Sequence, residues 1–140
     1  NIVMYSLYFD GASRNNPGPA SFGGVIYNEK GDEIDTYYQC IGIATNNVAE
    51  YCGLLAGLNR ARELNIKELK VFGDSNLIIQ QVTGKWKVKN DTLRAIYNQV
   101  KKVEPFFSAI SFKHVYRKDN KRADELANLA LDTKNNMCRG

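Results

Sequence analysis

The order in which the apolar pattern changes along the chain limits the fold more than any other feature of this sequence. In three runs within residues 3–42, apolar and polar residues alternate, which is typical of β-strands with two different faces. Short stretches of turn-forming residues separate the runs, so we expect an antiparallel meander. After residue 45 the apolar residues recur three or four positions apart, which indicates a helix, and strands and helices then alternate.

These patterns predict the order β-β-β-α-β-α-α-β-α. We expect strands near residues 3–10, 22–27, 33–42, 69–72 and 110–116, and helices near 46–65, 77–84, 91–105 and 120–132. An asparagine at 46 or 47, Asp91 and Asn120 are the expected N-caps of three helices. The fold class is therefore α/β: a five-stranded mixed sheet, with three antiparallel strands followed by parallel strands, flanked by helices on both faces.

The length of the chain bounds its organisation. At 140 residues it fits one domain, which we place at residues 1–132 with a C-terminal tail at 133–140. The sequence contains no run of 18 apolar residues and no signal peptide at its start. We therefore expect no membrane association, a cytoplasmic location and a monomer.

The three cysteines, Cys40, Cys52 and Cys138, match no zinc-binding or redox spacing. Their odd number is not that of a secreted disulfide framework, so a reducing compartment is the default expectation. A bridge from Cys40 or Cys52 to Cys138 in the tail remains an open alternative.

The positive charge of the chain is concentrated in one segment. The net charge is only +4, but residues 85–122 hold 11 of the 19 basic residues and three of the 15 acidic ones. Within that segment Lys85, Lys87 and Lys89 alternate, so an extended chain would present all three on one side to a phosphate backbone. A solvated surface strip is the alternative explanation. The composition thus permits a nucleic-acid partner without requiring one.

Four carboxylates fit poorly with a purely solvated role. Asp10 ends the first predicted strand, Asp74 ends the fourth, and Glu50 and Asp124 lie near the starts of two helices. Each has a structural explanation, as an Asx turn, an N-cap or an acid favoured by the helix dipole. In the expected sheet, however, all four elements converge at one end.

Grouped carboxylates repel one another unless cations neutralise them, and hard oxygen ligands select Mg²⁺ or Mn²⁺ over zinc. The single histidine, His114, cannot build a zinc site by itself. The chemistry that this group of acids suggests is phosphoryl transfer assisted by two metal ions.

Four motifs surround these acids, and each contains one of them. They are DGAS at residues 10–13 followed by NPGP at 16–19, TNNVAE at 45–50, GDS at 73–75 and NKRADELA at 120–127. In this order, and with the expected elements between them, the motifs resemble those of the type 1 ribonuclease H family. The resemblance runs from about residue 3 to residue 132.

The resemblance implies an endonuclease that hydrolyses the RNA strand of RNA/DNA hybrids and leaves 3′-hydroxyl and 5′-phosphate ends. It implies that Asp10, Glu50, Asp74 and Asp124 hold two Mg²⁺ ions, with Mn²⁺ as a substitute. It also implies a set of residues that contact the nucleic-acid backbone and the RNA 2′-hydroxyls: Gly11, Ala12, Ser13, Asn16, Asn46, Asn47 and Asn76. Thr45 and Asn90 match a pocket for a DNA phosphate, and Trp86 matches an aromatic residue of the DNA channel.

The sequence departs from the family pattern in two places. Only about ten residues separate Gln81 from Asp91, which leaves no room for the basic protrusion of many members. The loop before the last acid is also short and lacks the mobile histidine that helps to release product. We expect Arg117 to replace that histidine as a catalytic residue, with Lys118 as the second choice, and His114 to be a packed strand residue.

Other functions remain open at this level. The same fold supports other nucleases, such as resolvases and exonucleases, because fold alone does not fix the substrate. A non-catalytic hybrid-binding module would be expected to lack at least one of the four acids, whereas this chain has all of them. A domain appended to a reverse transcriptase is a further possibility.

Overall fold

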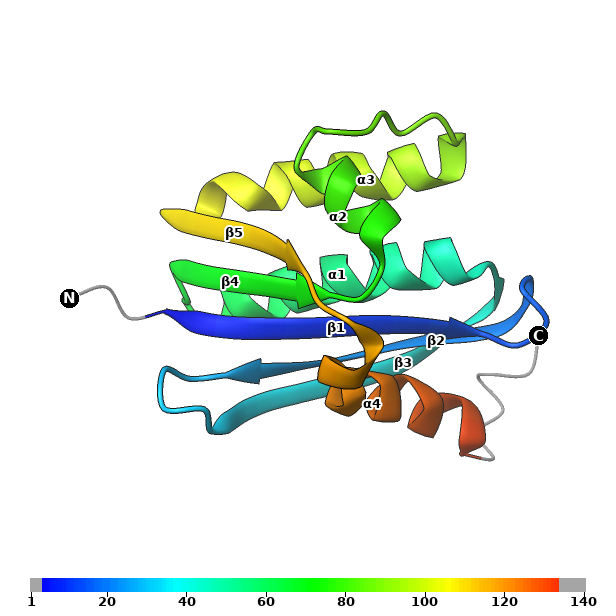
Figure 1. Ribbon diagram of the computed structural model, residues 1–140, viewed down its shortest axis with the longest axis horizontal. Helices are drawn as coiled ribbons and strands as arrows, with labels where there is room; N and C mark the ends of the chain where they lie inside the picture. The colour runs from blue at the N-terminus through cyan, green and yellow to red at the C-terminus, as the bar shows by residue number, and fades with distance from the viewer. Residues whose placement is uncertain (1–3, 134–140) are drawn as a thin grey trace.

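The computed structural model describes residues 4–133, and it has the expected order of elements (Figure 1). The strands are β1 (Tyr5–Ser13), β2 (Gly18–Tyr27), β3 (Glu33–Ala44), β4 (Glu68–Gly73) and β5 (Ala109–His114). The helices are α1 (Asn46–Glu63), α2 (Asn76–Val82), α3 (Asp91–Val103) and α4 (Lys121–Asp132), with short 3₁₀ turns at Glu104–Phe106 (η1) and Arg117–Asp119 (η2).

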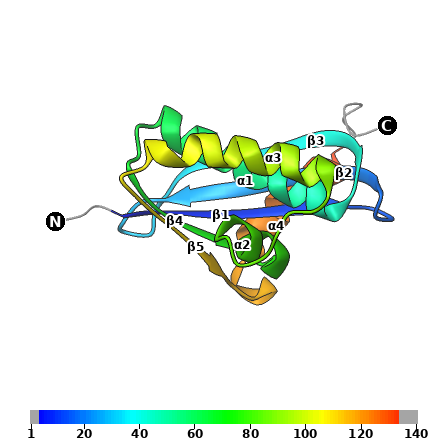
Figure 2. The same ribbon diagram turned by 90° about the horizontal axis from the view of Figure 1, so that it is seen from above.

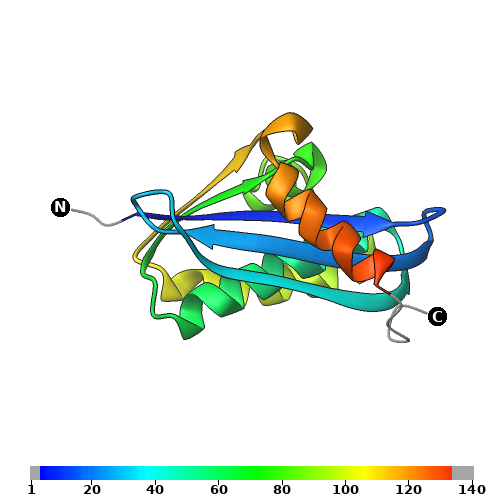
Figure 3. The same ribbon diagram turned by 90° about the horizontal axis from the view of Figure 1, so that it is seen from below.

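The five strands form one mixed sheet in the order β3-β2-β1-β4-β5. β2 pairs antiparallel with both β1 and β3, whereas β4 pairs parallel with β1 and β5. Helices α1 and α3 lie on one face of the sheet and α4 crosses the other (Figures 2 and 3). The predicted α/β class, the antiparallel and parallel halves of the sheet and the helices on both faces are therefore confirmed.

The core lies between the sheet and α1. Leu7 and Phe9 of β1 are fully buried and meet Tyr51, Leu54 and Leu58 of α1, which are also fully buried. This follows from the two periods of the sequence, because alternate residues of a strand and every third or fourth residue of a helix share one face. The opposite face of β1 carries Ser6, Tyr8 and Asp10.

The prediction that Asp10 ends the first strand is wrong. β1 continues for three residues, and Asp10–Ser13 pair with Gly23–Ala20 of β2. β2 correspondingly begins at Gly18, before the predicted start at residue 22. The turn is confined to residues 14–17, between the end of β1 and the start of β2, where Asn15 has a left-handed φ of 70°.

The predicted helix caps are shifted or altered. Thr45 caps α1 and Asn90 caps α3, each one residue or more before the expected position, and both side-chain oxygens accept a backbone N–H of the first turn. Asn120 stands at the N-cap of α4 but makes no side-chain capping bond. Its amide has other partners, which are described below.

Two other expectations are resolved only in part. Of the two cysteines considered for a bridge, Cys52 is a free thiol and Cys40 is disulfide-bonded. Cys138, the third cysteine, lies outside the described residues. Within residues 4–133 no helix combines the length and apolarity needed to cross a membrane.

Candidate metal and nucleic-acid site

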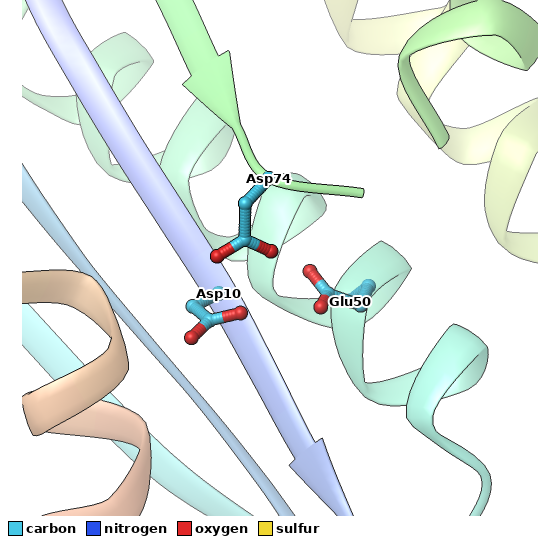
Figure 4. Close-up of side chains that lie close together, drawn as sticks. All are labelled: Asp10, Glu50 and Asp74. Carbon is cyan, nitrogen blue, oxygen red and sulfur yellow. The ribbon is translucent and has the colours of Figure 1, made fainter. Parts of the chain in front are cut away.

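Three of the four predicted acids form a tight cluster (Figure 4). One carboxylate oxygen each from Asp10, Glu50 and Asp74 lies within 4.8 Å of the others. They come from three elements that are far apart in the sequence: the middle of β1, the first turns of α1 and the residue that follows β4. The cluster thus exists only in the folded chain.

The splaying of two strands places Asp10 beside Asp74. The parallel pairing of β1 and β4 ends at Phe9 and Gly73, so Asp10 and Asp74 are the first residues beyond the last pair. β1 stays in the sheet with β2, whereas the chain after β4 turns away into α2. The gap that opens between the two strands lets acids from both faces of the sheet meet.

A glycine brings Glu50 to the same place. A Cβ atom at Gly11 would lie 2.4 Å from the backbone nitrogen of Glu50, which is far closer than atoms can pack. Only glycine therefore permits α1 to contact β1 at this point. The backbone of Glu50 is itself part of this contact with Gly11, and Gly11 is the neighbour of Asp10 in β1. The side chain of Glu50 therefore lies beside the carboxylate of Asp10.

The fourth acid reaches the site from the opposite face. Asp124 of α4 lines the same cavity of about 250 Å³ as Asp10, Glu50, Asp74 and Arg117. It is not among the three residues whose oxygens lie within 4.8 Å of one another. The sequence therefore located all four acids at one site, with three in closest contact.

The acids carry the electrostatic signs of a cation site. Burial, the Asp74 charge and a hydrogen bond to Asp124 raise the pKa of Asp10 to about 8. Burial and the nearby charges of Asp10 and Asp74 also raise the pKa of Glu50 well above its usual range. Glu50 is 8% exposed, and its Oε2 atom has no hydrogen-bond partner among the described residues. A buried oxygen left without a partner is costly unless a ligand such as a cation satisfies it.

Two asparagines that the sequence analysis did not place at the site hold the acids in position. Asn120 Nδ2 donates to the Phe9 carbonyl oxygen at 2.9 Å and to Asp74 Oδ2 at 3.2 Å. These bonds explain why Asn120 does not cap α4. Asn128 Nδ2 donates to Asp124 Oδ1 at 3.1 Å. The only sequence signal for Asn128 is its position four residues after Asp124, one helical turn along the same face.

Most of the residues expected to contact RNA surround the acids. Gly11, Ala12, Ser13, Asn46 and Asn47 line the carboxylate cavity. Asn16 lies next to them, since its Oδ1 accepts the backbone N–H of Asn46 at 2.9 Å. Asn76 is not among the lining residues, and its Oδ1 accepts from Gln80 within α2.

Thr45 and Asn90 come together at a second cavity of about 550 Å³, between the starts of α1 and α3. Each uses a side-chain oxygen as an acceptor to cap its own helix. The Thr45 hydroxyl proton and the Asn90 amide protons stay available as donors, and a phosphate accepts hydrogen bonds only. Two helix N-termini that face one cavity also favour an anion.

The basic strip and Trp86 lie on a surface connection between α2 and α3. Lys85, Lys87 and Lys89 are exposed as expected, but the segment is not a β-strand. Side chains of the two flanking helices fix its irregular path: the Lys87 carbonyl accepts from Gln81 Nε2 of α2, and the Val88 carbonyl accepts from Arg94 of α3. Trp86 is 48% exposed, so its ring is accessible.

The two residues considered as replacements for the loop histidine, Arg117 and Lys118, line different cavities. Arg117 lies in η2 and lines the carboxylate cavity, whereas Lys118 lines a different hollow. His114 is half-buried at the end of β5, and its ring meets that of Tyr116 edge to face at 5.6 Å.

The comparisons with known proteins agree with this geometry. The chain is similar to a bifunctional protein of Mycobacterium tuberculosis, at 44% identity over 124 residues that make up 88% of this chain and 34% of that protein. The solved N-terminal RNase H domain of that protein superposes with a TM-score of 0.90 at 42% identity, covering 94% of this chain and 95% of the solved one.

Ribonuclease HI of Halobacterium salinarum is 42% identical over 125 residues, which are 89% of this chain and 63% of that protein. The structure of LC11-RNase H1 in complex with an RNA/DNA hybrid gives a TM-score of 0.87 at 38% identity, with 91% of this chain and 96% of that chain covered. The chain thus spans about a third of the mycobacterial relative and less than two thirds of the Halobacterium one.

A family model described as reverse transcriptase-like matches residues 8–130, which is most of the chain. Together with the sheet order and the type 1 RNase H structures among its neighbours, this match establishes that the chain belongs to the reverse transcriptase-like family and forms an RNase H-like domain.

Proposed function

We propose that this domain hydrolyses the RNA strand of RNA/DNA hybrids at the carboxylate cluster, leaving 3′-hydroxyl and 5′-phosphate ends. The observation that carries the proposal is the cluster itself, in which three acids lie within 4.8 Å and the buried Glu50 Oε2 lacks a partner among the described residues. The similarity to ribonuclease HI, and to an RNase H1 solved with a hybrid, supports the choice of substrate.

The donor set fits a pair of hard divalent cations. Asp10, Glu50, Asp74 and Asp124 would hold two Mg²⁺ ions, with Mn²⁺ as a substitute, because all the ligands are carboxylate oxygens. When bound, such ions activate a water molecule and stabilise the leaving oxygen of a phosphodiester. The protein positions the ligands for these ions, since Asn120 and Asn128 hold the carboxylates of Asp74 and Asp124 by hydrogen bonds.

The cavity around the acids offers small side chains and short polar groups to the RNA strand. Gly11 and Ala12 would leave room for the ribose. Ser13, Asn46 and Asn47 would contact its 2′-hydroxyl, the group that distinguishes RNA from DNA, with Ser13 Oγ as an acceptor because its proton is donated to the Ala44 carbonyl. We place Asn16 and Asn76 at the margin of this surface. Arg117, as the exposed cation of the cavity, would attract the phosphate and help the product to leave.

The second cavity would take a phosphate of the DNA strand, and Trp86 with the basic strip would guide that strand. A sharp test is Asn90→Asp, because the new carboxylate still accepts the Leu93 N–H and keeps the helix cap. The variant loses its donors and gains a negative charge that repels phosphate. We expect hybrid Kd to rise about tenfold, with Tm within a degree or two, in a fluorescence anisotropy titration.

Asn98→Asp, on the exposed side of α3, is the matched control because it adds the same charge away from the cavity. Equal losses of affinity in the two variants would remove Asn90 from the phosphate site.

Strand-specific labelling tests the proposed reaction. A hybrid is labelled in turn on the RNA and on the DNA strand, and the products are separated on a denaturing gel. Cleavage is expected only in the RNA strand, and the downstream fragment should carry a 5′-phosphate that a phosphatase removes. Cleavage of the DNA strand would contradict the proposal, and binding without cleavage would favour a hybrid-binding module. We assign the activity to residues 1–132, acting as a monomer.

A further inference from the structure

A third hollow, larger than the two cavities described above, lies on the α4 face of the sheet beside the carboxylate cavity. Its volume is about 680 Å³, and we call it the Tyr8 groove. The floor is formed by β1, the end of β2 with the following turn, and β4, and one wall is formed by η2 and the start of α4. The lining of the groove includes Ser6, Tyr8, Tyr27, Lys70, Asn120 and Lys121.

The groove exists because α4 covers only part of its face of the sheet. The helix packs on β1, β2 and β3 and crosses them at an angle, so the end of β1 near its first residues stays uncovered (Figure 3). The residues of β1 that point to this face are Ser6, Tyr8 and Asp10. Tyr8 and Asp10 are two residues apart, so their Cα atoms are separated by about 6.6 Å, and the groove begins next to the acids.

Two aromatic rings, those of Tyr8 and Tyr27, line the floor of the groove and meet edge to face at 5.7 Å. The ring of Phe72 does not line the groove but supports its floor, because it stacks on Tyr8 at 4.8 Å with an interplanar angle of 21°. All three side chains are half-buried, so parts of the rings remain open to a ligand. A row of rings on a sheet surface is a platform on which nucleobases stack, whatever their sequence.

Cations surround this floor. Lys70, Lys118, Lys121 and Arg122 line the groove, against the two acids Glu29 and Asp119. Arg122 pairs with Glu33 and Glu125, but the three lysines form no ion pair with any acid in residues 4–133. Their charge is therefore available to a phosphate backbone.

The start of α4 adds donors and an unused acceptor. Lys121, Arg122 and Ala123 form its first turn and line the groove, and no side chain caps their N–H groups. Asn120 is 1% exposed, and its Oδ1 has no partner among the described residues.

We propose that the Tyr8 groove binds an unpaired nucleotide of a strand that extends beyond the RNA/DNA hybrid. The aromatic floor would take the base, and Lys70, Lys121 and the first turn of α4 would take the phosphate. The volume matches a ligand of nucleotide size, which is within the range of about 300–1,000 Å³ for such sites. Asn120 joins the two sites, since it lines the groove and donates to Asp74. The proposal rests on the proposed function, which brings a hybrid to the acids.

The test compares a blunt 12-base-pair hybrid with the same hybrid carrying four unpaired thymidines at each of its four ends in turn. Affinity is measured by fluorescence anisotropy without divalent metal, so that no cleavage occurs. We expect the extension at one end to raise the affinity at least fivefold. The double variant Lys70→Gln/Lys121→Gln should lose this gain but bind and cleave the blunt hybrid like the wild type.

The matched control is Arg62→Gln/Lys102→Gln, which removes two exposed positive charges from α1 and α3 on the other side of the sheet. It should keep the gain. The proposal is overturned if no extension raises the affinity, if both double variants lose the gain equally, or if free AMP binds the groove while no extension does. Failure of the proposed function shows separately, as absent cleavage of the blunt hybrid by the wild type.

Discussion

Replacing Asp10 by asparagine is expected to lower the rate of hybrid cleavage by about 1,000-fold or more. Asp10 sits at the centre of the cluster, within 4.8 Å of oxygens of Glu50 and Asp74 and hydrogen-bonded to Asp124. The amide has the same shape but no negative charge, so it cannot hold a cation beside the other acids. Single-turnover cleavage of a labelled hybrid in Mg²⁺ measures the loss.

Hybrid affinity of the same variant should stay within about threefold of the wild type, because the residues that contact the strands are unchanged. Asp91→Asn is the control, since it removes one exposed carboxylate at the start of α3. Cleavage by Asp10→Asn at the wild-type rate would remove Asp10 from the reaction. A parallel loss of affinity would show that Asp10 acts in substrate binding instead.

The metal-free protein is expected to lose stability as the pH rises from about 4 to about 8. The pKa of Asp10 is about 8 in the folded chain and near 3.8 when the chain is unfolded. Between these values the folded state retains a proton that the unfolded state has released, so the free energy of unfolding falls with increasing pH. The raised pKa of Glu50 acts in the same direction.

Thermal unfolding in EDTA at pH 5 and pH 8 measures this effect. Asp10→Asn should raise the stability at pH 8, because the amide carries no charge to desolvate, and should flatten the pH dependence. Added Mg²⁺ should stabilise the wild type more at pH 8 than at pH 5, because the cation binds the ionised cluster. A Tm in EDTA that does not change or rises between the two pH values would contradict the electrostatic account of the site.

The order of elements and the four acids could be predicted because each leaves a local mark on the sequence. The change of period at residue 45 separates strands from helices, and Glu50 stands on a helical face otherwise made of small and apolar residues. Strand ends are where such sheets place ligands, which led to Asp74. In the structure all four acids line the same carboxylate cavity.

The parts that could not be predicted depend on contacts between distant residues. β1 runs on to Ser13 because residues 20–23 of β2 pair with it, whereas the local signal at Gly11 resembled a turn. Polar residues in succession, such as Thr45-Asn46-Asn47, leave the identity of the N-cap open. Asn120 is in the capping position, but the Phe9 carbonyl and Asp74 take its amide. No pattern within α4 reveals those partners.

We expect this cluster of acids, loaded with divalent metal, to cleave RNA that is paired to DNA. The most direct measurement incubates the protein with a labelled RNA/DNA hybrid, duplex DNA, duplex RNA and single-stranded RNA, each with Mg²⁺, with Mn²⁺ and with EDTA. We expect cleavage of the hybrid in either metal, no cleavage in EDTA, and little or no cleavage of the other three substrates. Cleavage of duplex DNA in preference to the hybrid, or undiminished cleavage in EDTA, would contradict this expectation.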